Sequence, residues 1–234
     1  MKHMKLNKTK TLFIDVGYTI CFPLTGNWRF TKKFYDCVDM EKFNKISDKR
    51  KNEAIELSDK YLFSNHLLST LEEEYEQNVI AYSIIADYLP ELCLNINDIR
   101  KIAKDRTFNM DNYVFYPNAI RTLKLLSEFL NISIISDAWP SSRTLLKEAE
   151  IWEIIDTCTL SCDIGICKPN RAIYQKALDD SGAIPQFSVF VDDYEPNLVT
   201  AANLGIQPIK IQTVDKGKSA FPTIIQFSDM LYLF

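Results

Sequence analysis

Near its start the chain reads Thr11-Leu12-Phe13-Ile14-Asp15, an apolar run that ends abruptly at a carboxylate. The run is too short for a helix and is rich in residues that favour strands. It therefore predicts a buried strand over residues 11–14, with Asp15 at its carboxyl end. Similar runs predict strands over residues 132–135, 188–191 and 207–211, and a weaker one over residues 157–161.

Helical patterns lie between these predicted strands. They cover residues 119–129, 141–150, 171–181 and 196–204, the last ending at a glycine. Strands that alternate with helices are typical of a doubly wound parallel sheet with right-handed crossovers. In such a sheet the residues that follow the strands face one crevice. The sequence thus predicts an α/β, Rossmann-like fold.

The stretch from Thr25 to Asn112 interrupts this alternation. It is rich in charge, shows helical periodicity over residues 42–57, 67–88 and 97–108, and contains no convincing strand. We predict that residues 25–112 form an inserted helical domain. Residues 1–24 and 113–234 would then form the Rossmann-like core.

Bulk composition excludes several classes of partner. The 234 residues carry a net charge of −4 with both signs interspersed, so the chain lacks the basic patch that nucleic acid requires. No apolar stretch reaches the ~18 residues that cross a bilayer, so we expect no membrane partner and a cytoplasmic location. Six cysteines occur without a CxxC pair. They predict free thiols, buried or half-buried at Cys158, Cys162 and Cys167, rather than a zinc site.

Three carboxylates follow predicted strands. Asp15 ends the first strand, and Asp192 and Asp193 follow the run over residues 188–191. Since the carboxyl ends of adjacent parallel strands converge, these side chains could share one small volume, which requires a compensating cation. Mg²⁺ fits, because it prefers oxygen ligands and takes one or two carboxylates. Lys168 is a second positive charge that could screen Asp15, and the Ser136 hydroxyl could bind a phosphate oxygen.

Four segments together resemble the motifs of the haloacid-dehalogenase superfamily of hydrolases. In chain order they are Phe13–Ile20, Ile134–Ala138, Gly165–Pro169, and Phe190–Asp193 with Asn197 and Ala201-Ala202. They occur in the family order and at plausible spacing. The resemblance covers the core from Thr11 to Ile211 and leaves the inserted helices outside the motif match.

The resemblance implies a helical cap of the C1 type and a two-step hydrolysis through an aspartyl intermediate. It implies Asp15 as nucleophile and Mg²⁺ ligand, and the Gly17 carbonyl as a further ligand. Asp193 would be the main acidic ligand, with Asp192 in support. The phosphoryl group of a small phosphorylated metabolite would be bound by Ser136 and Lys168.

Two further candidates for substrate contact are Tyr18 and Asp137. Each has an alternative structural role. Tyr18 could instead be an aromatic residue that packs under the cap, and Asp137 could cap the helix that follows Pro140. A monomer and a homodimer both remain open.

Gly17 departs from the family pattern. Phosphatases of the family usually carry a second aspartate there, as general acid for the leaving alcohol, and its absence typically costs ~10²–10⁴ in rate. Branches that resemble sugar-phosphate phosphatases also combine Asp-x-Gly with a later Asp-Asp pair. A phosphatase therefore stays the first hypothesis for the function. Two alternatives remain. One is a haloacid dehalogenase, which uses an aspartate nucleophile without Mg²⁺, and the other is a catalytically weak binding or regulatory protein.

Overall fold

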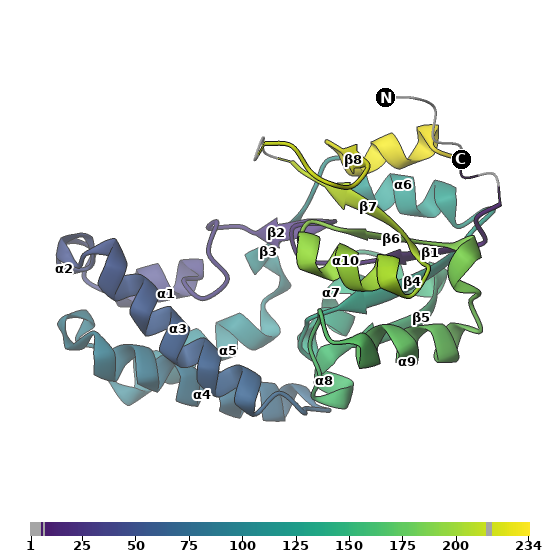
Figure 1. Ribbon diagram of the computed structural model, residues 1–234. Helices are drawn as coiled ribbons and strands as arrows, with labels where there is room; N and C mark the ends of the chain where they lie inside the picture. Colours follow the sequence, from purple (N-terminus) through teal and green to yellow (C-terminus); the bar gives the residue numbers. More distant parts are fainter. Residues whose placement is uncertain (1–5, 7, 214–216) are drawn as a thin grey trace. The chain divides into compact units, whose positions relative to one another are not determined.

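The computed structural model describes residue 6, residues 8–213 and residues 217–234. Its contacts divide the chain into two compact units (Figure 1). The core unit comprises Met1–Phe22, Phe115–Ala138 and Leu145–Phe234, and the helical unit comprises Pro23–Val114 and Trp139–Thr144. Within the described residues, no helix combines the length and the apolar character needed to cross a membrane.

A six-stranded parallel sheet forms the centre of the core unit. Its order is β5-β4-β1-β6-β7-β8, and the paired strands run parallel. The strands are β1 (Thr11–Ile14), β4 (Asn131–Ser136), β5 (Ile155–Leu160), β6 (Ser188–Asp192), β7 (Gln207–Ile211) and β8 (Thr223–Ile224). The predicted parallel sheet is confirmed. Only β8 was not predicted, because two residues are too few to give a pattern.

Helices flank this sheet (Figure 1). They are α6 (Ala119–Leu126), α7 (Ser141–Glu148), α8 (Ser161–Ile164), α9 (Arg171–Ser181) and α10 (Glu195–Asn203), with 3-10 turns η3 (Trp152–Ile154), η4 (Pro185–Phe187) and η5 (Phe227–Tyr232). Contacts join α9 to β4 and β5, and α10 to β6 and β7. Apolar side chains from both helices, including Tyr174 and Leu198, pack on Phe13 and Phe190 of the sheet. This buried layer fixes the strands whose ends carry the polar residues.

The helical unit contains α1 (Lys32–Cys37), α2 (Met40–Lys45), α3 (Asp48–Ser64), α4 (Leu71–Tyr88) and α5 (Ile96–Phe108), with 3-10 turns η1 (Pro90–Leu92) and η2 (Met110–Asn112). The helical stretch predicted over residues 42–57 is divided between α2 and α3 by a break at Ile46 and Ser47, where the first helix ends and the second is capped. The Asp39 carboxylate accepts from the first turn of α2, and Ser47 accepts from the Arg50 N–H of α3. Phe34, Tyr82 and Ile102 lie in the apolar core of this unit.

Two short strands lie where the chain passes between the units. β2 (Cys21–Pro23) and β3 (Tyr113–Phe115) form a two-stranded sheet. Each of these strands has three residues, too few for an alternating pattern in the sequence to reveal the strand.

The segment Trp139–Thr144 lies outside residues 25–112 in sequence but belongs to the helical unit. Glu74 of α4 holds it there, since its two carboxylate oxygens accept from the Ser141 N–H and the Ser141 hydroxyl, each at 2.7 Å. The Trp139 ring also meets the edge of His66, with ring centroids 4.4 Å apart. The chain therefore enters the helical unit a second time, directly after Asp137 and Ala138 of the core.

Candidate active site

Asp15 lies at the carboxyl end of β1, in the middle of the sheet. Ile14 is in register with Ile134 of β4 and with Val191 of β6, so Asp192 lies level with Asp15 on the neighbouring strand. The Asp15 N–H continues the ladder by donating to the Val191 carbonyl at 3.0 Å. The side chain is buried, at 6% exposure. Such a carboxylate requires partners, because desolvation disfavours its charged form.

Lys168 supplies one partner. Its ammonium donates to Asp15 Oδ1 and to Asp192 Oδ2, each at 2.7 Å. Burial lowers the pKa of Lys168, but the charges of Asp15, Asp192 and Asp137 outweigh burial and raise the pKa above its ordinary value. The ammonium is therefore charged throughout the physiological range, and it forms a buried bridge between the ends of two adjacent strands.

Two hydroxyl groups also donate to the Asp15 carboxylate. The Ser136 hydroxyl, at the end of β4, donates to Oδ1 at 2.8 Å. The Thr19 hydroxyl donates to Oδ2 at 3.3 Å. Sequence reasoning singled out Ser136 and missed Thr19, although Thr19 lies inside the first motif segment. A hydroxyl residue four positions after the carboxylate was the available signal.

Asp192, like Asp15, accepts hydrogen bonds at both of its carboxylate oxygens. Its Oδ1 accepts from the Tyr194 N–H at 2.7 Å, and its Oδ2 accepts from the Asn197 side chain at 2.9 Å as well as from Lys168. Burial raises the pKa of Asp192, and the Lys168 charge opposes that rise. Both oxygens are thus engaged by the protein, an arrangement that suits Asp192 to positioning Lys168.

Asp137 holds the loop that carries Lys168. Its Oδ1 accepts from the Lys168 backbone N–H at 2.8 Å. Burial raises the pKa of Asp137 to about 6, against the lowering effect of the Lys168 charge. The sequence offered Asp137 as a substrate contact or a helix cap, and the structure adds this third role.

Asp193 completes an acidic cluster with Asp15 and Asp192. One oxygen from each of the three side chains lies within 4.8 Å of the others. Three carboxylates this close together supply hard oxygen donors, which fit a divalent ion such as Mg²⁺. Asp15 and Asp193 would hold it, with Asp192 in support and the Gly17 carbonyl as a further donor.

Tyr18 occupies the left-handed region of backbone space, with φ of 54°. This conformation is uncommon for a bulky residue and is found most often at turns and functional sites. The Tyr18 N–H donates to the Cys21 carbonyl at 2.6 Å. Its side chain lines a hollow of the core unit together with Asp193, so the sequence-predicted residue lies beside the acidic cluster.

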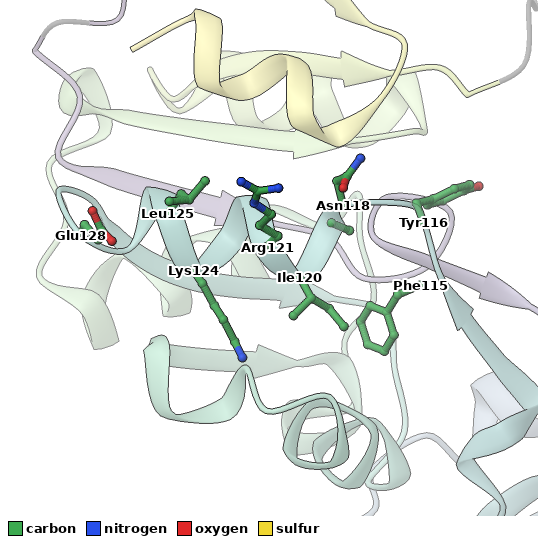
Figure 2. A pocket seen from close by; sticks show the side chains of 9 residues that line it. Phe115, Tyr116, Asn118, Ile120, Arg121, Lys124, Leu125 and Glu128 are labelled. Carbon is green, nitrogen blue, oxygen red and sulfur yellow. The ribbon is translucent and has the colours of Figure 1, made fainter.

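A second and larger hollow, about 590 Å³, runs along α6 (Figure 2). Its lining contains none of the acidic cluster and not Lys168. The side chains of Arg121 and Lys124 leave α6 in opposite directions, so these two basic groups do not converge on a common point (Figure 2). The candidate catalytic residues of the core unit therefore lie at the carboxyl ends of the central strands and not in the larger hollow along α6.

The six cysteines are free thiols, as the sequence predicted. Cys162 is buried, and Cys158 and Cys167 are half-buried. Burial raises the pKa of Cys167 to about 11, with a smaller contribution from Asp137. The neighbour of Lys168 is therefore an unreactive thiol.

The family model described as haloacid dehalogenase-like hydrolase matches residues 30–211. The match covers more than half of the chain. With the parallel sheet and the polar residues at its edge, it defines the class of protein. The chain belongs to the haloacid dehalogenase-like hydrolases.

Curated relatives match parts of the chain. The mouse acyl-CoA dehydrogenase family member 10 is 35% identical over 72 residues, which are 31% of this chain and 7% of that protein. The (S)-2-haloacid dehalogenase 4A of Burkholderia cepacia is 31% identical over 115 residues, 48% of this chain and 50% of that enzyme. The matched region thus spans half or less of the length of these relatives.

Solved structures share the fold over nearly the whole chain. A HAD phosphatase from Thermococcus onnurineus has a TM-score of 0.63 at 19% identity and covers 95% of this chain and 96% of its own. The HAD hydrolase YfnB of Bacillus subtilis, bound to magnesium, has a TM-score of 0.67 at 11% identity and covers 96% and 98%. Phosphatases and dehalogenases thus both stand among the similar proteins, and at these identities the structures establish the fold alone.

Proposed function

We propose that this hydrolase is a Mg²⁺-dependent phosphatase that acts on a small phosphorylated metabolite through an aspartyl-phosphate on Asp15. The supporting observation is the acidic cluster of Asp15, Asp192 and Asp193, with oxygens within 4.8 Å of one another, beside the buried Lys168. A nucleophilic aspartate alone needs no cluster of three carboxylates, whereas a divalent ion is bound by carboxylate oxygens gathered in this way.

The reaction proceeds in two displacements. A carboxylate oxygen of Asp15 attacks the phosphorus, the bond to the leaving alcohol breaks, and water then cleaves the aspartyl-phosphate to release phosphate and restore Asp15. Lys168 and Ser136, which contact Asp15 Oδ1 directly, would bind the phosphoryl oxygens. A bound Mg²⁺ would add positive charge that offsets the charge of the phosphoryl group.

The helical unit would serve as the cap that selects the substrate. Its helices carry no catalytic motif, and the family motifs lie in the core unit. In the proposal the core performs the chemistry and the helical unit restricts which alcohol reaches it.

The test is release of inorganic phosphate from a panel of sugar and aryl phosphates with Mg²⁺. Asp15→Asn removes the nucleophile, and we expect activity to fall by at least ~10³-fold because the covalent route is lost. Asp156→Asn, at an exposed carboxylate of β5, is the matched control and should keep full activity. Absence of turnover with every substrate would count against a phosphatase.

The haloacid dehalogenase reaction is a second candidate. It is supported by the 31% identity to the Burkholderia cepacia enzyme across 48% of this chain, and by the missing acid at position 17. Halide release from 2-chloropropionate with EDTA present would establish it. A catalytically weak binding protein is the third. Turnover that is absent in the parent and appears in Gly17→Asp would favour that interpretation.

A further inference from the structure

A hollow of about 350 Å³ lies within the core unit beside the acidic cluster. Asp193 forms part of its wall. Tyr18, Phe22 and Tyr116 line it, together with residues 210–213 at the end of β7. Its size is at the lower end of the range for small-molecule pockets. A phosphoryl group bound beside Asp193 would therefore have this hollow next to it.

Three aromatic rings form part of the wall. Phe22 and Tyr116 pack against each other with centroids 4.8 Å apart and rings inclined by 40°. The backbone fixes this pair, because the Tyr116 N–H donates to the Ile20 carbonyl at 2.9 Å. Tyr18 adds a third ring from its left-handed position, where φ is 54°. Rings held in this way suit a planar apolar group, which stacks on them or meets their edges.

The positive charge of Lys210 in the wall of the hollow is already paired, and Asp193 adds a carboxylate to the same wall. Lys210 lines it, and its ammonium is paired with Glu195 Oε1 at 2.8 Å. The hydroxyl groups of Tyr116 and Thr213 lie 3.3 Å apart and share a hydrogen bond. The hollow thus combines three aromatic rings with the Asp193 carboxylate and a lysine that is already paired, which favours an uncharged ring over a second phosphate or a carboxylate.

Gly17 points independently to the same class of substrate. Without a general acid at that position, the leaving oxygen departs with little proton assistance, so a leaving group of low pKa is favoured. A phenol has a pKa of about 10, as in tyrosine, far below that of an alkyl alcohol. An aryl phosphate therefore needs the missing acid least.

We propose that the hollow lined by Tyr18, Phe22 and Tyr116 binds the ring of an aryl phosphate, so that the preferred substrates are phosphate monoesters of small phenols. This inference rests on the proposed phosphatase function. It places the ring of the leaving group in the core unit and makes Phe22 and Tyr116 determinants of specificity.

The experiment compares 1-naphthyl phosphate with acetyl phosphate, which has a good leaving group and no ring. In Tyr116→Ala we expect the ratio of their kcat/KM values to fall about tenfold, mainly through KM for the aryl ester, since a ring contact is lost. Tyr116→Phe keeps the ring and should restore the ratio. Phe129→Ala, at an aromatic residue that is 57% exposed in the core unit, is the control and should leave it unchanged.

Binding gives a readout that does not depend on turnover. With Mg²⁺ present, calorimetry should show phenylphosphonate binding about tenfold more tightly than methylphosphonate, and Tyr116→Ala should remove the difference. Should Tyr116→Ala fail to fold, Phe22→Leu tests the same wall.

The outcomes separate the two proposals. Phosphate release with an unchanged ratio and equal phosphonate affinities would overturn the aryl pocket and leave the phosphatase standing. No phosphate release from either 1-naphthyl phosphate or acetyl phosphate and no binding of either phosphonate would overturn both.

Discussion

Lys168 decides the electrostatics of the site at the scale of single residues. It is the one ammonium that contacts Asp15 and Asp192 among the described residues, and both pairs are almost wholly buried. Buried ion pairs add little net stability, but removal of one member leaves the other charge without compensation. The loss of Lys168 should therefore affect folding as well as catalysis.

Lys168→Met is expected to lower the free energy of unfolding by about 3–5 kcal/mol in EDTA, because two buried carboxylates lose their counter-charge. Urea denaturation measures the change. Lys176→Met is the matched control, since its pair with Asp180 leaves both side chains 41% exposed, and it should cost less than about 1 kcal/mol. Equal losses of unfolding free energy in Lys168→Met and Lys176→Met would contradict the buried ion pairs of Lys168 with Asp15 and Asp192.

At the scale of elements, the turn after α3 meets the segment that follows β4 of the core. His66 is buried at 3% exposure and lies against the Trp139 ring. Burial, with a smaller contribution from the Arg29 charge, lowers the pKa of His66 to about 4. The native state therefore holds His66 neutral at pH values where an unfolded histidine, with a pKa of about 6.5, is protonated.

This difference makes stability depend on pH. Above pH 6.5 the residue is neutral in both states and its contribution is complete. As the pH falls from about 6.5 to 4, the unfolded state binds the proton first, so stability drops by at most about 1.4 kcal/mol per pH unit. His66→Gln, which does not titrate, should flatten the pH dependence of the unfolding midpoint over this window. A slope identical to that of the wild type would show that His66 is not responsible.

The whole molecule consists of a core unit built on the parallel sheet and a helical unit, which are joined by several chain crossings. The chain passes between them around Phe22, Val114, Ala138 and Thr144. The crossing at Ala138 directly follows Ser136 and Asp137, so the segment after β4 belongs to both units. A ligand that binds at the carboxyl ends of the central strands should accordingly raise the stability of the intact protein.

Mg²⁺ at about 100 times its dissociation constant is expected to raise the melting temperature by about 5–10 °C, because it binds the folded state only. Asp193→Asn should abolish the rise by removing a principal ligand. Asp156→Asn, at the exposed carboxylate used above, should retain it. Differential scanning calorimetry with and without EDTA gives the comparison, and an undiminished rise in Asp193→Asn would refute the ion site.

The local pattern of the chain determined the architecture of the core and the position of its chemistry. Four of the runs read as strands form the sheet where expected, and the run over 157–161 corresponds to β5, which begins two residues and ends one residue earlier. Asp15, Ser136, Asp192 and Asp193 follow these strands, and parallel pairing necessarily brings such residues to one edge. This much is predictable because burial imposes short apolar runs and short-range periodicity on the sequence.

Only the tertiary structure decided how the groups at that edge contact one another. The bond between Ser136 and Asp15 spans 121 positions of the chain, and the bond between Lys168 and Asp15 spans 153. The Thr19 contact, the Asp137 bond to the Lys168 backbone and the aromatic hollow of Phe22 and Tyr116 likewise leave no periodic signal. These contacts arise from packing between segments that are distant in sequence. Periodicity along the chain reports only on neighbouring residues, so it does not predict such contacts.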